Sequence, residues 1–417
     1  MKTITEQLPL RIALLALLAL PGTACGGETA SPGAADGPRR QPDAGTRRPD
    51  AGTSVDAGGR TQDGAPRPDG ARADGGGLAD AALRDAAGPD AGTGRLASGT
   101  VTLAANGVSD AFRFTVPAGT RSVNVVVEGA EDRLYALAAL RLADGSDRVG
   151  IDTTTSYAAM MEESYNVLQS GGMPGGLYQS IRLGTFTHVY PYAPGQSVPV
   201  GPAELRVASN ATSGPVRITV VMPAEDAARV LHLDVLAVSR DLVLANPPGF
   251  LAPLQAIYDQ AGIQVVVDSI VEVRDSPLAR ITESTEPQES PVSQSAQLAR
   301  LATQRAPGPG LNVMIVDALP AGIAGLSLGT PGPPTGGYYH GVLAVRGSDA
   351  GLARVLAHEI AHFLALQHVT NRDTRGLLIE DPIDDTRPGQ GNLMENGTTL
   401  TPGQTFALTR SALLSAR

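Results

Sequence analysis

Three of the six histidines lie close together in the segment HEIAHFLALQH, which also holds a glutamate. His358 and His362 are four residues apart, so on an α-helix their directions differ by only about 40° and both imidazoles can reach one ion. Glu359 lies beside them and is better placed to take a proton from a water on that ion than to be a third ligand. This arrangement is the HExxH zinc signature.

His368 can supply a third imidazole only if the chain turns sharply. On an unbroken helix it would stand about 15 Å along the axis from His358, at about 1.5 Å per residue. Ligand nitrogens lie about 2.0–2.1 Å from zinc, so the spacing predicts that the helix ends after about Leu364. Three neutral imidazoles leave a fourth position for water, which is typical of a catalytic site rather than a closed structural one.

The segment HEIAHFLALQH resembles the metzincin motif HExxHxxGxxH, with Ala365 where that family has the glycine that makes the turn. If Ala365 takes the left-handed conformation, it costs roughly 1 kcal/mol. Downstream, GNLMENG resembles the Met-turn that underlies the zinc site in metzincins, with Met394 as its methionine. The stretch DPIDDTRPGQGNLM and the following LTPGQ are similar to the pappalysin-like group of that clan.

The resemblance implies a zinc-dependent endopeptidase that acts on proteins or peptides. Its metal ligands would be His358, His362 and His368, and Glu359 would be the general base. In metzincins the edge strand before the zinc helix pairs with extended substrate. The matching strand here is 341–345, so the candidate substrate-binding residues are Gly341, Val342 and Leu343.

Two departures from the family pattern leave a second hypothesis open. Ala365 replaces the turn glycine, and Asn396 stands where several metzincins have a tyrosine two residues after the turn methionine. No tyrosine is therefore assigned to the oxyanion. The alternative is a catalytically inert surface lipoprotein with a metzincin-like domain, in which the preceding β domain carries recognition.

Four carboxylates lie close together in the segment before Met394: Glu380, Asp381, Asp384 and Asp385. Carboxylate oxygens are ligands that Ca²⁺ prefers, so this segment can form a calcium site. It can equally line a substrate pocket or form a solvated acidic loop. Zn²⁺ is the expected cofactor, and Ca²⁺ is a second candidate.

The elements that must position these groups form an expected α/β domain over residues 224–417. Ser348 and Asp349 provide an N-cap and an acidic first turn for the histidine helix. Earlier, 230–238 is typical of a strand, 250–262 of an amphipathic helix that ends at a glycine, and 263–273 of the next strand. The segment LTPGQ adds a capping box with proline at the first helical position, which predicts a terminal helix.

Residues 98–223 are expected to form an all-β sandwich of the jelly-roll type. Short β-branched runs separated by turns, such as RSVNVVVE and VRITVVM, favour this fold. The segment DAFRFTVPAGTRSVNVVVEG resembles the strand-turn-strand core of bacterial pre-peptidase C-terminal domains, small jelly-roll modules carried by many secreted proteases. Its role is either that of a structural spacer or binding of a substrate or polysaccharide.

The first 24 residues carry a basic start, a short apolar run and small residues, the pattern of a secretory signal peptide. The apolar run is too short to span a bilayer, which takes about 20 residues. Cleavage before Cys25 would expose the chain's one cysteine, and Thr23–Cys25 resembles the lipobox of bacterial lipoproteins. The resemblance implies lipidation of Cys25 and a membrane anchor in the cell envelope or outer membrane. Ordinary cleavage and secretion is the alternative.

Residues 25–97 consist mainly of Gly, Ala, Asp, Pro and Arg, with a recurring PDAG. They have almost no large apolar side chains whose burial could offset the loss of conformational entropy on folding. A disordered tether therefore precedes the folded part of this multidomain chain of 417 residues. The single cysteine excludes an internal disulfide and a zinc site built from cysteines alone. The net charge of -10 removes the electrostatic support for nonspecific nucleic-acid binding, so no nucleic-acid partner is expected.

Overall fold

The computed structural model of the protein describes residues 24–25, 95–131, 133, 135–149, 178–182, 184–209, 213–239, 244–274, 276–282, 297, 301, 309–334, 340–372, 378–381, 383–395 and 397–414. These residues belong to one compact unit of the chain. They form mostly β-strands and few helices, so the expected β-rich fold is confirmed. The predicted signal peptide, except Ala24, and most of the predicted tether lie outside the described residues.

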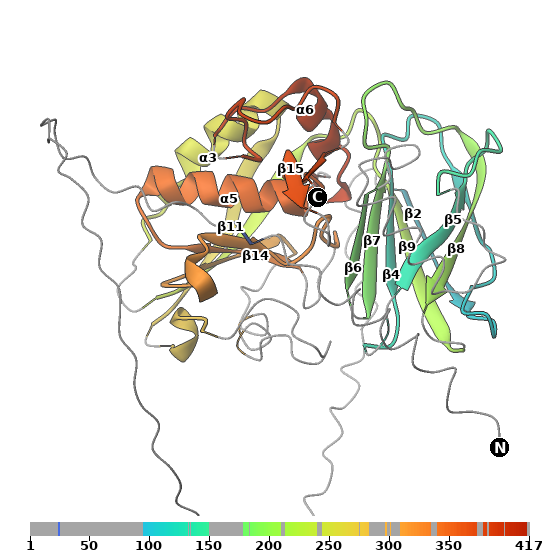
Figure 1. Cartoon of the computed structure of the whole chain (residues 1–417), viewed down its shortest axis with the longest axis horizontal. Helices are drawn as coiled ribbons and strands as arrows, with labels where there is room; N and C mark the ends of the chain where they lie inside the picture. The colour runs from blue at the N-terminus through green and yellow to red at the C-terminus, as the bar shows by residue number, and fades with distance from the viewer. Residues whose placement is uncertain are drawn as a thin grey trace, which may run out of the picture. The chain divides into compact units, whose positions relative to one another are not determined.

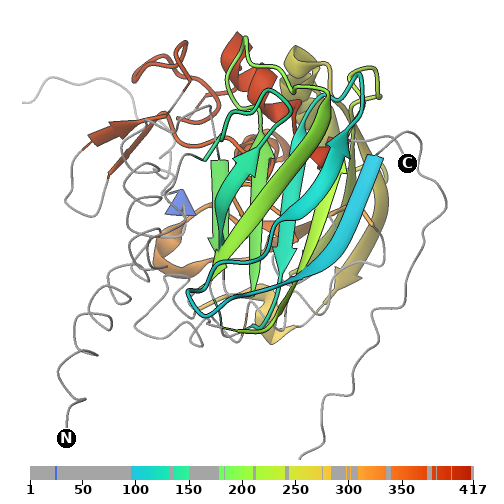
Figure 2. The ribbon, with the colours of Figure 1, turned by 90° about the vertical axis from the view of Figure 1, so that its right-hand side faces the viewer.

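Two antiparallel sheets make up the first folded region, the two-sheet domain (Figures 1 and 2). One sheet has the strand order β2 (Arg95–Thr102), β9 (Pro215–Met222), β4 (Val123–Glu128), β7 (Thr185–Tyr190) and β6 (Tyr178–Arg182). The other has the order β3 (Phe112–Val116), β8 (Gly201–Ser209) and β5 (Tyr135–Arg141). Both sheets contribute side chains to one hydrophobic cluster, in which Val125 from β4 and Leu205 from β8 are fully buried. Burial of a shared apolar face stabilises this pair of layers.

A mixed sheet forms the second region, the mixed-sheet domain. Its strand order is β11 (Gln264–Val273), β10 (Val230–Val238), β12 (Leu311–Val316), β14 (Gly341–Val345), β13 (Gly325–Ser327) and β1 (Ala24–Cys25). The first four strands are parallel, β13 runs antiparallel to β14, and β1 runs antiparallel to β13. All six residues of β12 are buried, as expected for a parallel strand that is covered on both faces.

The strand order corrects one prediction. The segment Gly341–Val345 was expected at the edge of the sheet, yet β14 pairs with β12 on one side and with β13 on the other. The backbone groups of Val342 and Leu343 are therefore used within the sheet, and Gly341 pairs with Asn312 of β12. An internal strand cannot accept a further strand; β13 lies beyond β14, and the two-residue strand β1 pairs with the far side of β13.

Two helices cover one face of the mixed sheet. Helix α3 (Leu251–Tyr258) continues as the 3-10 turn η1 (Asp259–Ala261) and ends at Gly262 with φ of 61°. Helix α5 (Asp349–Phe363) lies across the sheet (Figure 1). The Tyr258 hydroxyl donates to the backbone oxygen of Ala357 at 2.9 Å, and this bond joins the two helices.

The other described elements are short: η2 (Pro277–Ala279), η4 (Pro320–Gly322), β15 (Thr370–Arg372), β16 (Leu378–Glu380), α6 (Pro402–Leu408) and η5 (Ala412–Leu414). At the start of α6, Thr401 and Gln404 form the predicted capping box. Within the described part of the chain, no helix has the length and apolar character needed to cross a membrane.

Candidate metal centre

Helix α5 carries two of the histidines; it is capped at its start, and its second half is buried. The Ser348 hydroxyl accepts a hydrogen bond from the amide of Gly351 at 3.2 Å, and Asp349 supplies a negative charge in the first turn. From Leu356 to Phe363 every residue is buried. The two histidines of the helix are therefore held by packing on a rigid element.

Helix α5 ends at Phe363 with Leu364 as its C-cap, within one residue of the predicted end, and Ala365 makes the turn. Ala365 has φ of 96°, and it is the one non-glycine residue with positive φ in the described ranges. The amide of Leu366 donates to the oxygen of Ala361, and the amide of Ala365 donates to that of His362, which is a Schellman motif. An alanine thus performs the turn that usually takes glycine, and the chain reverses toward His368.

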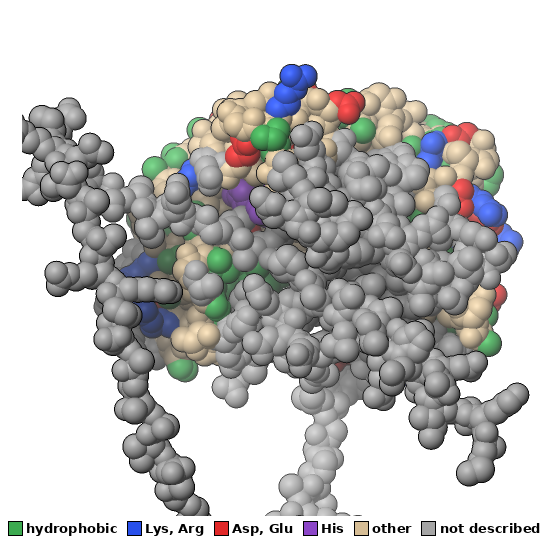
Figure 3. All heavy atoms as spheres, viewed as in Figure 1, with side chains coloured by type: hydrophobic (Ala, Val, Ile, Leu, Met, Phe, Trp, Pro, Cys, Tyr) green, Lys and Arg blue, Asp and Glu red, His purple; other side chains and the backbone are tan. Residues whose placement is uncertain are grey.

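The turn brings His368 to the two helix histidines. The Nε2 atom of His368 lies 3.1 Å from that of His358 and 3.2 Å from that of His362. Ligands about 2.0–2.1 Å from zinc at tetrahedral angles are about 3.3 Å apart, so this spacing fits a single ion. The three histidines form a group that can hold a metal ion, and no other such group occurs among the described residues. Histidine side chains reach the surface in the view of Figure 3.

Backbone oxygens orient the two helix histidines. The Nδ1 atom of His358 lies 2.7 Å from the oxygen of Leu393, and that of His362 lies 2.7 Å from the oxygen of Leu366. A carbonyl oxygen only accepts, so each Nδ1 carries the hydrogen and each Nε2 is left with its lone pair. Carbonyl partners of this kind fix the ring orientation of metal-binding histidines and raise their basicity as ligands.

The three imidazoles are held neutral. Burial lowers the pKa of His358, and burial together with the neighbouring His368 and His358 lowers that of His362 well below its ordinary value. Burial and the proximity of His358 lower the pKa of His368 to about 3. Neutral imidazole is the form that binds a metal. Because burial keeps the three rings neutral, the cluster can bind a cation at neutral pH without first losing protons.

Glu359 is fully buried against the strand β13. A Cβ atom added at Gly325 of this strand would lie 2.6 Å from both Cγ and Oε1 of Glu359. Only glycine lets the strand approach the carboxylate so closely. This contact could not be predicted from the sequence, because an isolated glycine in a three-residue strand matches no pattern.

Met394 is buried in a turn that is tied to the metal helix. Its amide donates to Oδ1 of Asn392 at 2.9 Å, and the same oxygen accepts from Nε2 of Gln404 at 3.3 Å. The neighbouring residue Leu393 provides the oxygen that orients His358. The predicted turn around Met394 is therefore part of the support of the histidine cluster.

The acidic segment uses two of its carboxylates within the fold. Asp381 accepts from the amide of Ile383 and from the hydroxyl of Thr386. Asp385 accepts from the hydroxyl of Thr401 and from the amide of Gly403, at the start of α6. Asp384 is exposed. Ca²⁺ binding by this segment stays a prediction, and the role of Asp385 as a cap of α6 was not predicted from the sequence.

The metal-binding group includes none of the remaining predicted residues that the structure describes. Cys25, the expected lipidation site, pairs through its backbone with Gly325 in the β1–β13 ladder, and its lipidation stays a prediction. His232 contacts Asp268 at 2.9 Å, His340 lies beside Asn312, and His188 is a buried residue of β7. As expected, none of these three joins the metal-binding group.

No family model matches this chain. No curated protein sequence matches it either.

Proposed function

We propose that this protein is a zinc-dependent peptidase whose mixed-sheet domain has a metzincin-like fold. The observation that carries the proposal is the convergence of one ring nitrogen from each of three histidines within 4.8 Å of one another, beside the buried Glu359. His358, His362 and His368 would hold the zinc ion. When bound, zinc polarises a carbonyl oxygen and lowers the pKa of a bound water toward about 7.

Glu359 is the proton carrier in this proposal. Its carboxylate takes the proton of the attacking water and gives it to the nitrogen of the leaving amine, so no proton is gained or lost overall. The contact with Gly325 fixes the carboxylate in place before substrate arrives. A carboxylate held in this way needs little reorganisation during the reaction.

The outer edge of β13 is the candidate binding place for an extended peptide. Ala24 and Cys25 pair with Leu326 and Gly325 there in the antiparallel sense, so a strand fits this edge. Addition of a strand to a sheet edge is a common mode of peptide recognition. In this proposal the substrate backbone replaces β1, and the scissile bond lies next to Glu359.

The turn at Ala365 weakens the alternative of an inert binding protein. That alternative depended on Ala365 and Asn396 as departures from the metzincin pattern. Ala365 adopts the positive φ that the turn needs, and His368 reaches the other histidines. We further propose that the two-sheet domain is of the jelly-roll type and that the chain is exported, with Cys25 as its lipid anchor.

The test is zinc content and peptide-library cleavage of the full chain, measured for the wild type and for Glu359→Gln. We expect one zinc per chain in both and chelator-sensitive cleavage in the wild type alone. Glu128→Gln is a matched control, because Glu128 lies on a half-exposed site of the two-sheet domain facing Arg217. Unchanged cleavage by Glu359→Gln would refute the proposal. Zinc binding without cleavage by the wild type would favour the inert alternative.

A further inference from the structure

One side chain of the two-sheet domain lies in the core of the mixed-sheet domain. Tyr192 follows strand β7 by two residues and is only 1% exposed. It belongs to the hydrophobic cluster under α3 and α5, whose other described members all lie at or beyond Leu231. The two domains therefore share a core at this position rather than meeting across a polar surface.

The neighbours of Tyr192 are the residues that carry the third histidine. Tyr192 shares its hydrophobic cluster with Leu366 and Val369, the residues on either side of Gln367 and His368, and its hydroxyl lies on the side of Gln367 and Asp381. Gln367 directly precedes His368, and the amide of Asp381 donates to the oxygen of Val369 at 3.0 Å. Tyr192 thus borders the turn 366–369, which both supplies His368 and, through the oxygen of Leu366, orients His362.

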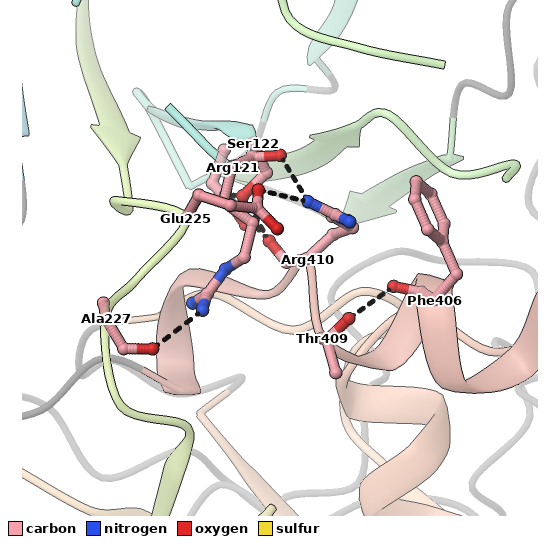
Figure 4. A network of polar contacts seen from close by, with 8 residues as sticks. Arg121, Ser122, Glu225, Ala227, Phe406, Thr409 and Arg410 are labelled. Atoms are coloured by element: carbon pink, nitrogen blue, oxygen red, sulfur yellow. Dashed lines mark hydrogen bonds and ion pairs between the residues drawn. The ribbon is translucent and has the colours of Figure 1, made fainter. Parts of the chain in front are cut away.

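A second set of contacts joins the two-sheet domain to the segment after α6 (Figure 4). The Ser122 hydroxyl donates to the oxygen of Arg410 at 2.6 Å, and the Arg410 guanidinium donates to the oxygen of Arg121 at 3.0 Å. The Asn124 side chain accepts from the amide of Ala412 at 2.9 Å. Both Ser122 and Asn124 are buried, so these bonds are shielded from water.

Helix α6 connects these contacts to the residues that orient His358. Helix α6 carries Gln404, whose side chain donates to Asn392. Asn392 holds the turn of Met394, and Leu393 in that turn orients His358. The two-sheet domain therefore contacts two segments that continue into the support of the histidine cluster: the turn 366–369 and the chain that follows α6.

We propose that the two-sheet domain completes the metal centre, with Tyr192 as a positioning residue for the turn 366–369. The proposal rests on the proposed zinc site and adds a role for a domain that was expected to be a spacer or a binding module. Groups that orient metal ligands without touching the metal typically contribute about 10–100-fold to metal affinity.

The test uses the full chain and a cobalt titration, because Co²⁺ absorption reports ligand geometry directly. Tyr192→Phe keeps the ring and removes the hydroxyl beside Gln367. We expect it to bind Co²⁺ about tenfold more weakly than the wild type, with an altered visible spectrum. Tyr192→Ala should weaken binding further. Tyr190→Phe is the matched control, because Tyr190 is equally buried but belongs to the cluster of the two-sheet domain; its Co²⁺ affinity should be unchanged.

Wild-type affinity and spectrum in Tyr192→Phe would overturn the role of Tyr192, even if Tyr192→Ala fails to fold. A merely structural role would lower the unfolding midpoint of Tyr192→Phe without changing the Co²⁺ spectrum. Failure of the wild type to bind Co²⁺ would refute the metal centre and this inference together. Tight Co²⁺ binding without peptide cleavage would refute the peptidase alone and leave the role of Tyr192 standing.

Discussion

Acidification should destabilise the metal-free protein through its three histidines. In the folded chain the pKa of His368 is about 3, because the ring is buried beside His358, whereas an exposed histidine has a pKa of 6.5. As the pH falls through 6.5, the unfolded chain binds a proton at this residue and the folded chain does not. Proton binding then favours the unfolded state. The contribution of His368 to the free energy of unfolding is therefore complete above the pKa of the unfolded chain and is lost as the pH falls below it.

The size of the effect follows from the two pKa values of His368. Between about pH 7 and about pH 5 the linkage relation gives a loss of about 2 kcal/mol for this residue alone. His358 and His362 are shifted in the same direction and add to the loss. A loss of this size is a large fraction of the stability of an ordinary domain, which is about 5–15 kcal/mol.

Urea unfolding of the metal-stripped protein at the two pH values measures this loss. The chain has nine tyrosines and no tryptophan, so circular dichroism and tyrosine emission are suitable signals. His368→Gln removes the titrating group, and its stability should fall by about 2 kcal/mol less than that of the wild type. His232→Gln is the control outside the cluster. Equal losses in the wild type and His368→Gln would refute the reasoning.

Three further predictions concern single positions. Gly325→Ala forces β13 or Glu359 to move, and we expect peptide turnover to fall by about 10–100-fold with zinc content unchanged, measured by kinetics and metal analysis. Ala365→Val places a β-branched residue at positive φ in a fully buried site and should cost about 2–4 kcal/mol in urea unfolding, whereas Ala365→Gly should stay within about 1 kcal/mol. Arg410→Met removes the hydrogen bond to the oxygen of Arg121 and should lower the free energy of unfolding, measured by thermal unfolding, by about 1–2 kcal/mol. Glu225→Gln should lower it less, because the ion pair between Glu225 and Arg410 is half-exposed.

Local patterns in the sequence predicted the parts of the site that local geometry determines. The spacing of the histidines, the helix end after Leu364 and the capping box at Thr401 all depend on residues within about one or two helical turns of each other. Ala365 was identified as the turn residue from its place in the metzincin-like motif. These features agree with the structure in position.

Contacts between distant parts of the chain could not be predicted in this way. Strand β13 has only three residues, too few for an alternating pattern, so the edge position was assigned to 341–345 instead. The insertion of Tyr192 depends on how two domains pack, and an isolated aromatic residue after a strand carries no signal of its partner. The closeness of Gly325 to Glu359 likewise appears only once the strand order is known.

The bonds of Ser122 and Asn124 to the chain around Arg410 also imply an effect of the metal on the two-sheet domain. Binding free energies are reciprocal between coupled sites. If the two-sheet domain strengthens metal binding, a bound metal must strengthen the junction between the domains by the same amount. Amide hydrogen exchange in β4 then becomes slower when the metal is bound, although β4 contains none of its ligands. A strand of the two-sheet domain would thus report whether the metal centre is filled.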